Sequence, residues 1–243
     1  MKHNLTAVLI SSALIMGSAQ AHHLWIEQDG KQATLYFGEY GDNLREVSPG
    51  RLDRFVKPTA QKVSSKGSEQ LTAVKAANGF TLSSVAAKGE SLLAEDAAYP
   101  ITDRKDGDKT YRSLYVPAAR FAADTARQEP KLTLDVVPTG KVEKGMVELQ
   151  VFYKGKPLHK AKVAVVTASG WMQEISSAED GKLMVAMPWA GSYVMEVKQA
   201  DGAGERGGEK YDRASYVTSL TMVQEAGIAP LPAPVAAVPS KMN

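Results

Sequence analysis

The amino-acid sequence predicts an all-β protein of two β-modules, the second an antiparallel sandwich of the Ig-like or prealbumin-like kind. Three observations predict this fold. The chain beyond residue 21 contains many short segments rich in β-branched and aliphatic residues. Gly, Asp, Asn, Lys and Pro residues separate these segments at turn positions. In residues 146–222 apolar and polar residues alternate, and about six or seven strands so spaced are typical of a sandwich.

Residues 1–21 have the composition of a secretory signal peptide. Lys2 provides a positive start, and residues 5–16 are mostly apolar but too few to span a bilayer comfortably. Ala19 and Ala21 are the small residues that a signal peptidase requires before the bond it cleaves. We therefore expect cleavage after Ala21, a mature chain that begins at His22, and a periplasmic or secreted location.

Residues 22–138 are expected to form an N-terminal β-rich module. A helix start is indicated only at residues 49–55, because Ser48 can act as an N-cap and Pro49 suits the first helical position. Residues 90–108 become polar and lose the strand pattern, so we expect an exposed loop there. The segments with strand character are residues 23–27, 32–37, 71–76, 80–85 and 132–137.

Residues 139–224 are expected to form the sandwich module, and residues 225–243 a disordered tail. The tail is rich in Ala and Pro and has no periodicity. The segments of the sandwich with strand character are residues 146–153, 160–167, 173–176, 183–187, 193–197 and 214–222.

Composition excludes several functions. The 243-residue chain has no cysteine, so it can form neither a disulfide nor a thiolate metal site. Its formal net charge of +2 falls to +1 without Lys2, which does not suggest a nucleic-acid partner. It contains no Gly-x-Ser-x-Gly elbow, no His-Glu-x-x-His sequence and no phosphate-binding glycine loop. The sequence therefore predicts a protein that is not an enzyme, and any metal would need nitrogen, oxygen or thioether ligands.

His22 is the first candidate metal ligand. At the start of a mature chain, its α-amine and ring Nδ1 atom can chelate one ion. The unperturbed pKa values, near ~8 for the amine and ~6.5 for the imidazole, make both available near neutral pH. Nitrogen donors of this kind suit Ni(II), Co(II) and Cu(II). The alternative is that His22 is only a solvated chain end. His23 is the next candidate, or else a histidine of an edge strand.

Further candidates lie elsewhere in the sequence. Glu39 and Asp42 follow a predicted strand and could complete a mixed nitrogen and oxygen site. The alternative is turn chemistry, in which Asp and Asn side chains hydrogen-bond the local backbone.

His159 lies on a turn before a sandwich strand, where the positive charge of the neighbouring Lys160 disfavours binding of a cation. Met184 and Met187 would point to opposite faces of a strand, which favours a role in the core.

Three runs of residues resemble the DUF4198 family: His-His-Leu-Trp-Ile-Glu at 22–27, Phe-Gly-Glu-Tyr-Gly-Asp-Asn-Leu at 37–44, and Tyr-Asp-Arg-Ala-Ser-Tyr at 211–216. Its members are secreted bacterial β-proteins related to the periplasmic components of nickel and cobalt uptake systems. The resemblance implies periplasmic handling of a transition metal; it does not imply a catalysed reaction. Members of that family often carry a small residue or Pro in place of His159.

The sequence thus predicts a periplasmic protein that binds Ni(II) or Co(II), or alternatively Cu(II), for a membrane metal transporter. A second interpretation is a carbohydrate- or envelope-binding sandwich in which Trp171 and Trp189 are stacking platforms. A third is a copper-dependent oxygenase, which would need a second imidazole facing His22. The candidate metal ligands are His22, His23, Glu39, Asp42 and His159.

Overall fold

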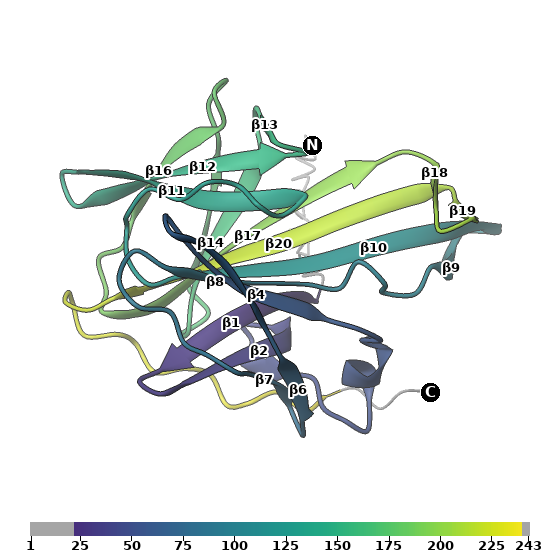
Figure 1. The fold of residues 1–243 in the computed structure, drawn as a ribbon, viewed down its shortest axis with the longest axis horizontal. Coiled ribbons are helices and arrows are strands. Elements are labelled where there is room, and N and C mark those ends of the chain that lie inside the picture. Colours follow the sequence, from purple (N-terminus) through teal and green to yellow (C-terminus); the bar gives the residue numbers. More distant parts are fainter. Residues whose placement is uncertain (1–21, 240–243) are drawn as a thin grey trace, which may run out of the picture.

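A computed structural model describes residues 22–239 and confirms the all-β fold (Figure 1). The expected signal peptide and its cleavage site at Ala21 lie outside the described residues. Between residues 22 and 239 every regular element is a strand, except for one turn of 3-10 helix, η1 (Arg51–Arg54). No helix in this range is long and apolar enough to cross a membrane.

A nine-stranded sheet, here called the central sheet, runs through the molecule. Its order is β15-β14-β17-β20-β10-β8-β4-β5, with β9 beside β10. β10 and β20 pair in parallel and run side by side through the middle of Figure 1. The strands are β4 (Thr59–Ser64), β5 (Gly67–Leu71), β8 (Ser91–Glu95), β9 (Thr102–Asp106), β10 (Lys109–Ala122), β14 (Lys162–Thr167), β15 (Met172–Ser176), β17 (Gly191–Asp201) and β20 (Arg213–Gln224).

Two smaller sheets cover opposite faces of the central sheet. The lower sheet in Figure 1 has the order β1-β2-β7-β6 with β3 beside β2, and the upper sheet has the order β11-β12-β13 with β16 beside β12. β18 (Gly204–Arg206) and β19 (Glu209–Tyr211) form a separate hairpin. The lower strands are β1 (His23–Asp29), β2 (Gln32–Glu39), β3 (Leu44–Arg45), β6 (Ala73–Ala76) and β7 (Gly79–Leu82); the upper strands are β11 (Leu134–Glu143), β12 (Met146–Tyr153), β13 (Lys156–Pro157) and β16 (Lys182–Ala186).

Packing on β17 shows that the central sheet is buried on both faces. Met195 belongs to the core beneath the upper sheet, together with Leu149. Its neighbour Val194 packs with Trp25 of the lower sheet, because successive strand residues point to opposite faces. The expected division between residues 138 and 139 falls inside β11, and β10 of the first half pairs with β20 of the second. The two halves therefore share one sheet.

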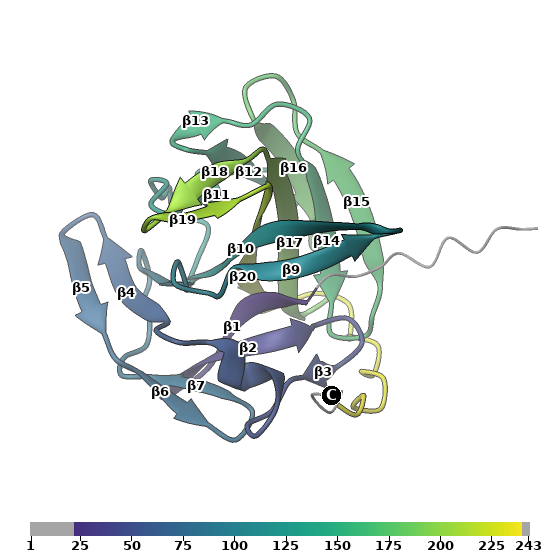
Figure 2. The ribbon, with the colours of Figure 1, turned by 90° about the vertical axis from the view of Figure 1, so that its right-hand side faces the viewer.

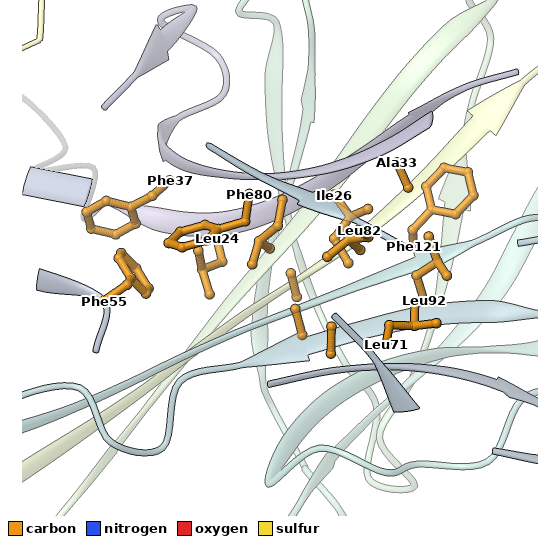
Figure 3. Packing of buried hydrophobic residues seen from close by; sticks show 14 of the residues in the cluster. Leu24, Ile26, Ala33, Phe37, Phe55, Leu71, Phe80, Leu82, Leu92 and Phe121 are labelled. Atoms are coloured by element: carbon orange, nitrogen blue, oxygen red, sulfur yellow. The ribbon is translucent and has the colours of Figure 1, made fainter. Parts of the chain in front are cut away.

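The core between the lower sheet and the central sheet fixes the beginning of the described chain (Figure 3). Leu24 and Ile26 of β1 are fully buried there. The ring centroids of Phe37 and Phe55 are 4.8 Å apart, in an edge-to-face contact. Burying an aliphatic or aromatic side chain of this size stabilises a fold by about 1.5–3 kcal/mol. This packing holds β1, and with it residue 22, against the central sheet.

Two segments of the first half differ from the prediction. Residues 49–55 were expected to begin a helix, but only the four residues of η1 form one turn, and the Asp53 carboxylate accepts hydrogen bonds from Ser48 Oγ (2.7 Å) and the Gly50 amide (2.9 Å). Residues 90–108 were expected to be a loop but contain β8 and β9. The four residues of β9 that follow Thr102 are exposed, so the strand has no apolar face that a sequence pattern could reveal.

The tail is also more ordered than expected in its described part. Residues 229–239 form no helix or strand, as their composition predicts. The backbone of Ile228, however, exchanges hydrogen bonds with Ala190 and Pro188, each 2.9 Å long. Asn43 Nδ2 donates to the carbonyl oxygen of Pro234 at 3.0 Å. This stretch of the tail therefore lies against the body of the protein.

Candidate metal centre

His22 lies directly before β1 and is held in place by the central sheet. Its carbonyl oxygen accepts a 2.7 Å hydrogen bond from the hydroxyl of Tyr115 on β10. Its ring packs 5.4 Å from the ring of Phe37, and only 19% of its side chain is exposed. In this structure His22 is therefore a positioned residue rather than a solvated one.

Two carboxylates contact the two ring nitrogens of His22. Oε1 of Glu46 lies 2.6 Å from Nε2, and Oε1 of Glu39 lies 3.1 Å from Nδ1. The Glu46 side chain is fully buried, and the guanidinium of Arg51 is 3.8 Å from it. A neutral imidazole carries one proton. If that proton is donated from Nε2 to Glu46, the lone pair of Nδ1 faces Glu39.

The hairpin between β2 and β3 brings both carboxylates to His22. Gly38 pairs with both His23 and Arg45, and the Glu46 amide donates to the carbonyl oxygen of Phe37 at 2.8 Å. Gly38 has a φ of 149°, and a Cβ atom there would clash with the carbonyl oxygen of Leu44. Glycine at this position therefore allows the two strands to approach closely enough for the site to form.

The turn of this hairpin contains the predicted cluster of Asp42 and Asn43. Asn43 adopts a φ of 52°, and its backbone N–H donates to the carbonyl oxygen of Tyr40 at 3.1 Å. The Asn43 side chain instead contacts Arg45 and the carbonyl oxygen of Pro234, so it does not make the local side-chain bond of the turn chemistry that was the alternative. Asp42 is exposed, and its carboxyl group hydrogen-bonds with Glu39. The structure thus places Asp42 at the edge of the His22 cluster.

The cluster is rich in acidic groups, two of which have raised pKa values. Partial burial, a hydrogen bond with Asp42 and the charges of Asp42 and Glu46 raise the pKa of Glu39 to about 7. Burial and the charges of Glu39 and Asp42 raise the pKa of Glu196, on β17, to about 8. Glu39 and Glu46 contact His22, and Glu196 contacts His23, while Asp42 lies beside Glu39. A bound cation would relieve the mutual repulsion of these carboxyl groups.

The other two histidines in residues 22–239 take different positions. His23 is buried, with Nε2 3.0 Å from Oε1 of Glu196 and its ring 5.4 Å from that of Trp25. It lies on the opposite face of β1 from its neighbour His22 and reaches the cluster through Glu196. His159 is exposed on the turn between β13 and β14 and contacts none of the cluster residues.

The structure thus brings His22, Glu39 and Asp42 together, with His23 adjacent and His159 elsewhere. In the described part of the chain, no group of three or more His, Asp or Glu side chains is placed to hold a metal ion by itself. A metal site at His22 would need a donor that is not a side chain.

Sequence reasoning missed three residues of the site. Glu196 has a recognisable signal, since it is a single acid within the apolar run of β17. Glu46 comes two residues after the Gly-Glu-Tyr-Gly-Asp-Asn-Leu run that was singled out. Tyr115 has no local signal, because only the pairing of distant strands brings it to His22.

No protein-family model, curated protein or solved structure matches this chain. Its function is therefore inferred from the residues and geometry of the site.

Proposed function

We propose that the protein binds a transition-metal ion, Ni(II) or Co(II) and alternatively Cu(II), at His22 in the periplasm and carries it to a membrane metal transporter. In this proposal cleavage after Ala21 frees the α-amine of His22. The amine and Nδ1 then form a chelate, and Glu39 supplies the next ligand. The three runs of residues that resemble DUF4198 proteins led to the same expectation, and no protein-family model matches the chain.

The contact between His22 and Glu39 carries the proposal. Ligand atoms about 2.0–2.1 Å from one ion, at right angles to each other, are separated by about 2.9 Å. The observed 3.1 Å between Nδ1 and Oε1 of Glu39 is close to that separation. These two atoms could therefore occupy neighbouring positions around one ion.

Glu46 supports the proposal from the other side of the ring. A histidine that binds a metal usually donates its second ring N–H to a carboxylate or carbonyl oxygen, which fixes the tautomer and strengthens the ligand. Glu46 lies at hydrogen-bonding distance from Nε2 and is fully buried. Its other oxygen, Oε2, has no hydrogen-bond partner in the described residues. Oε1 of Glu46 is therefore placed to accept the Nε2 proton and so to orient the His22 ring.

The number of protein donors suits a carrier. The amine, the imidazole and one carboxylate leave coordination positions for water or a small molecule, whereas structural metal sites are usually closed by four protein ligands. An open site releases its ion to a partner more readily than a closed one.

The two alternative functions gain less support. The rings of Trp171 and Trp189 are 5.0 Å apart and inclined at 59°, and both pack on the core beneath the upper sheet. They therefore do not form one flat platform for a sugar. The oxygenase would need a second imidazole facing His22. His23 is instead next to Glu196, and His159 is outside the cluster.

The proposal is tested by calorimetric titration of the mature chain, starting at His22, with Ni(II), Co(II) and Cu(II). A second preparation retains Ala21, which converts the amine into an amide and leaves every side chain unchanged. We expect one ion per native chain and at least about tenfold weaker binding for the extended chain. His159→Ala is the matched control and should bind as the native chain does. Equal affinity of the native and extended chains would refute the terminal chelate.

A further inference from the structure

A pocket of about 500 Å³ is lined by His22 and by residues of η1, β9, β10, β17 and β20. Figure 2 shows how these elements are arranged, with the β9–β10 hairpin above β1 and β2. The volume is within the range of about 300–1,000 Å³ that is usual for small-molecule sites. His22 is one of the lining residues, so the pocket adjoins the candidate metal centre.

The floor of the pocket is one face of the central sheet. Tyr111, Ser113 and Tyr115 alternate along β10 and therefore share a face. Ser215, opposite Tyr115 in the parallel pairing, and Val217 continue this face on β20. The hydroxyl groups of Tyr111, Ser113 and Ser215 thus provide hydrogen-bond donors on the floor, whereas the Tyr115 hydroxyl already donates to His22.

Five cationic side chains surround this floor, and none of the lining residues between 22 and 239 carries a carboxylate. They come from separate parts of the chain: Arg51 and Arg54 from η1, Arg104 and Lys105 from β9, and Lys198 from β17. Residues three apart in a 3-10 turn eclipse each other, which puts both arginines of η1 on the same side. The sequence has 29 basic and 27 acidic residues, so this one-sided charge does not reflect the overall composition.

These cations are mostly uncompensated. Arg51 lies 3.8 Å from Glu46. Within residues 22–239 no carboxylate comes within 4 Å of the charged groups of Arg54, Arg104, Lys105 or Lys198. Like charges around one cavity repel each other over distances comparable with the ~8 Å Debye length at physiological salt. A bound anion would remove this repulsion.

We infer that the pocket binds a small polycarboxylate that completes the metal's coordination, so that the cargo is a metal–polycarboxylate complex. This inference rests on the proposed function. Carboxylates suit both halves of the site, because they pair with Arg and Lys and are also ligands for transition metals. The pocket supplies the cations, His22 supplies the nitrogen ligands, and the position of His22 in the wall brings the two together.

Citrate is the probe for a titration of the mature chain, first without metal and then with one equivalent of Ni(II). We expect citrate to bind in both cases, more tightly with Ni(II), and to bind more weakly as the salt concentration rises.

The double variant Arg104→Glu/Lys105→Glu should weaken citrate binding by about tenfold or more. The control Lys88→Glu/Lys156→Glu makes the same charge change at two exposed lysines outside the pocket and should bind citrate as the native chain does. Circular dichroism checks that both double variants are folded.

The outcomes separate this inference from the proposed function. Nickel binding without any citrate binding would overturn the inference and leave the terminal chelate standing. Citrate binding that depends on Arg104 and Lys105, in a chain that binds no nickel, would support the anion pocket but overturn the metal complex as cargo. An equal loss of citrate binding in the two double variants would mean a general charge effect and would overturn the pocket. Inorganic phosphate is the comparison anion, and if it bound as tightly as citrate the assignment to polycarboxylates would be wrong.

Discussion

The Nε2 atom of His22 lies 2.6 Å from Oε1 of Glu46, whose side chain has no exposed surface. This contact connects the first described residue to the end of the β2–β3 hairpin. It orients the ring so that Nδ1 points to Glu39, 3.1 Å away. The metal proposal therefore depends on a residue that would not itself touch the ion.

Glu46→Gln should weaken metal binding without removing a ligand. Loss of the carboxylate that accepts the second ring N–H of a metal-binding histidine typically reduces metal affinity about 10–100-fold. The reason is that the ring is then held less firmly in its preferred tautomer and orientation. Calorimetric titration of the mature variant with Ni(II) measures this. Glu69→Gln, which changes an exposed carboxylate paired with Lys62, is the control. Unchanged affinity in the Glu46 variant would mean that Glu46 has only a structural role.

Gly38→Ala should destabilise the hairpin that carries Glu39. The new methyl group would meet the carbonyl oxygen of Leu44, and the φ of 149° is unfavourable for alanine. We expect the free energy of unfolding to fall by roughly 1–3 kcal/mol. Gly107→Ala is the matched control, because it also has positive φ (60°) but open space around the added carbon. Urea denaturation compares the two, and an equal loss of stability would exclude the clash as the cause.

Asp135→Ala should be among the most destabilising single substitutions. Asp135 and Arg120 are both fully buried and form a bidentate pair, with N···O distances of 3.0 and 2.7 Å. Removing one partner of a buried pair typically costs about 3–5 kcal/mol, because the other charge remains buried. The exposed pair of Arg127 and Glu129 is the comparison, and Arg127→Met should change the free energy of unfolding by less than about 1 kcal/mol. Similar urea midpoints for the two variants would contradict this prediction.

The contribution of Asp53 to stability should disappear in acid. Hydrogen bonds from Ser48, the Gly50 amide and Lys75 lower the pKa of Asp53 from 3.8 to about 2. Because the folded-state pKa is the lower one, the contribution is complete well above pH 4 and is lost as the pH falls towards 2. Asp53→Asn should therefore unfold at a lower urea concentration than the native chain at pH 6, and the difference should narrow by pH 2.5. A difference that stayed constant over this range would show that these bonds do not depend on the charge.

Local sequence patterns predicted the all-β fold and the part of the site that lies within one hairpin. Glu39 and Asp42 lie close together in the sequence, and His22 follows the expected leader. The pattern did not reveal β10, because Pro117 and Arg120 interrupt its apolar residues, and the buried Arg120 is compensated by a distant acid. The alternation rule was also of limited use for β20, where residues 217–222 are all buried because sheets cover both faces.

The residues that complete the site could not be predicted for the same reason. Glu196 and Tyr115 reach the cluster only through the pairing order of the central sheet, which no local pattern specifies. The cations of the pocket are likewise scattered over three elements, η1, β9 and β17. Their convergence is a property of the fold rather than of any motif.

The parallel pairing of β10 with β20 has a consequence for the order of folding. Tyr115 on β10 holds the backbone of His22, and Ser219 on β20 donates a 2.6 Å hydrogen bond to the carbonyl oxygen of Leu24. The first residues of the described chain are thus positioned by its last strand, and contacts so distant in sequence form slowly. A partly synthesised chain would lack these two hydrogen bonds until β10 and β20 are in place, so residues 22 and 24 would reach their final positions only in the finished molecule.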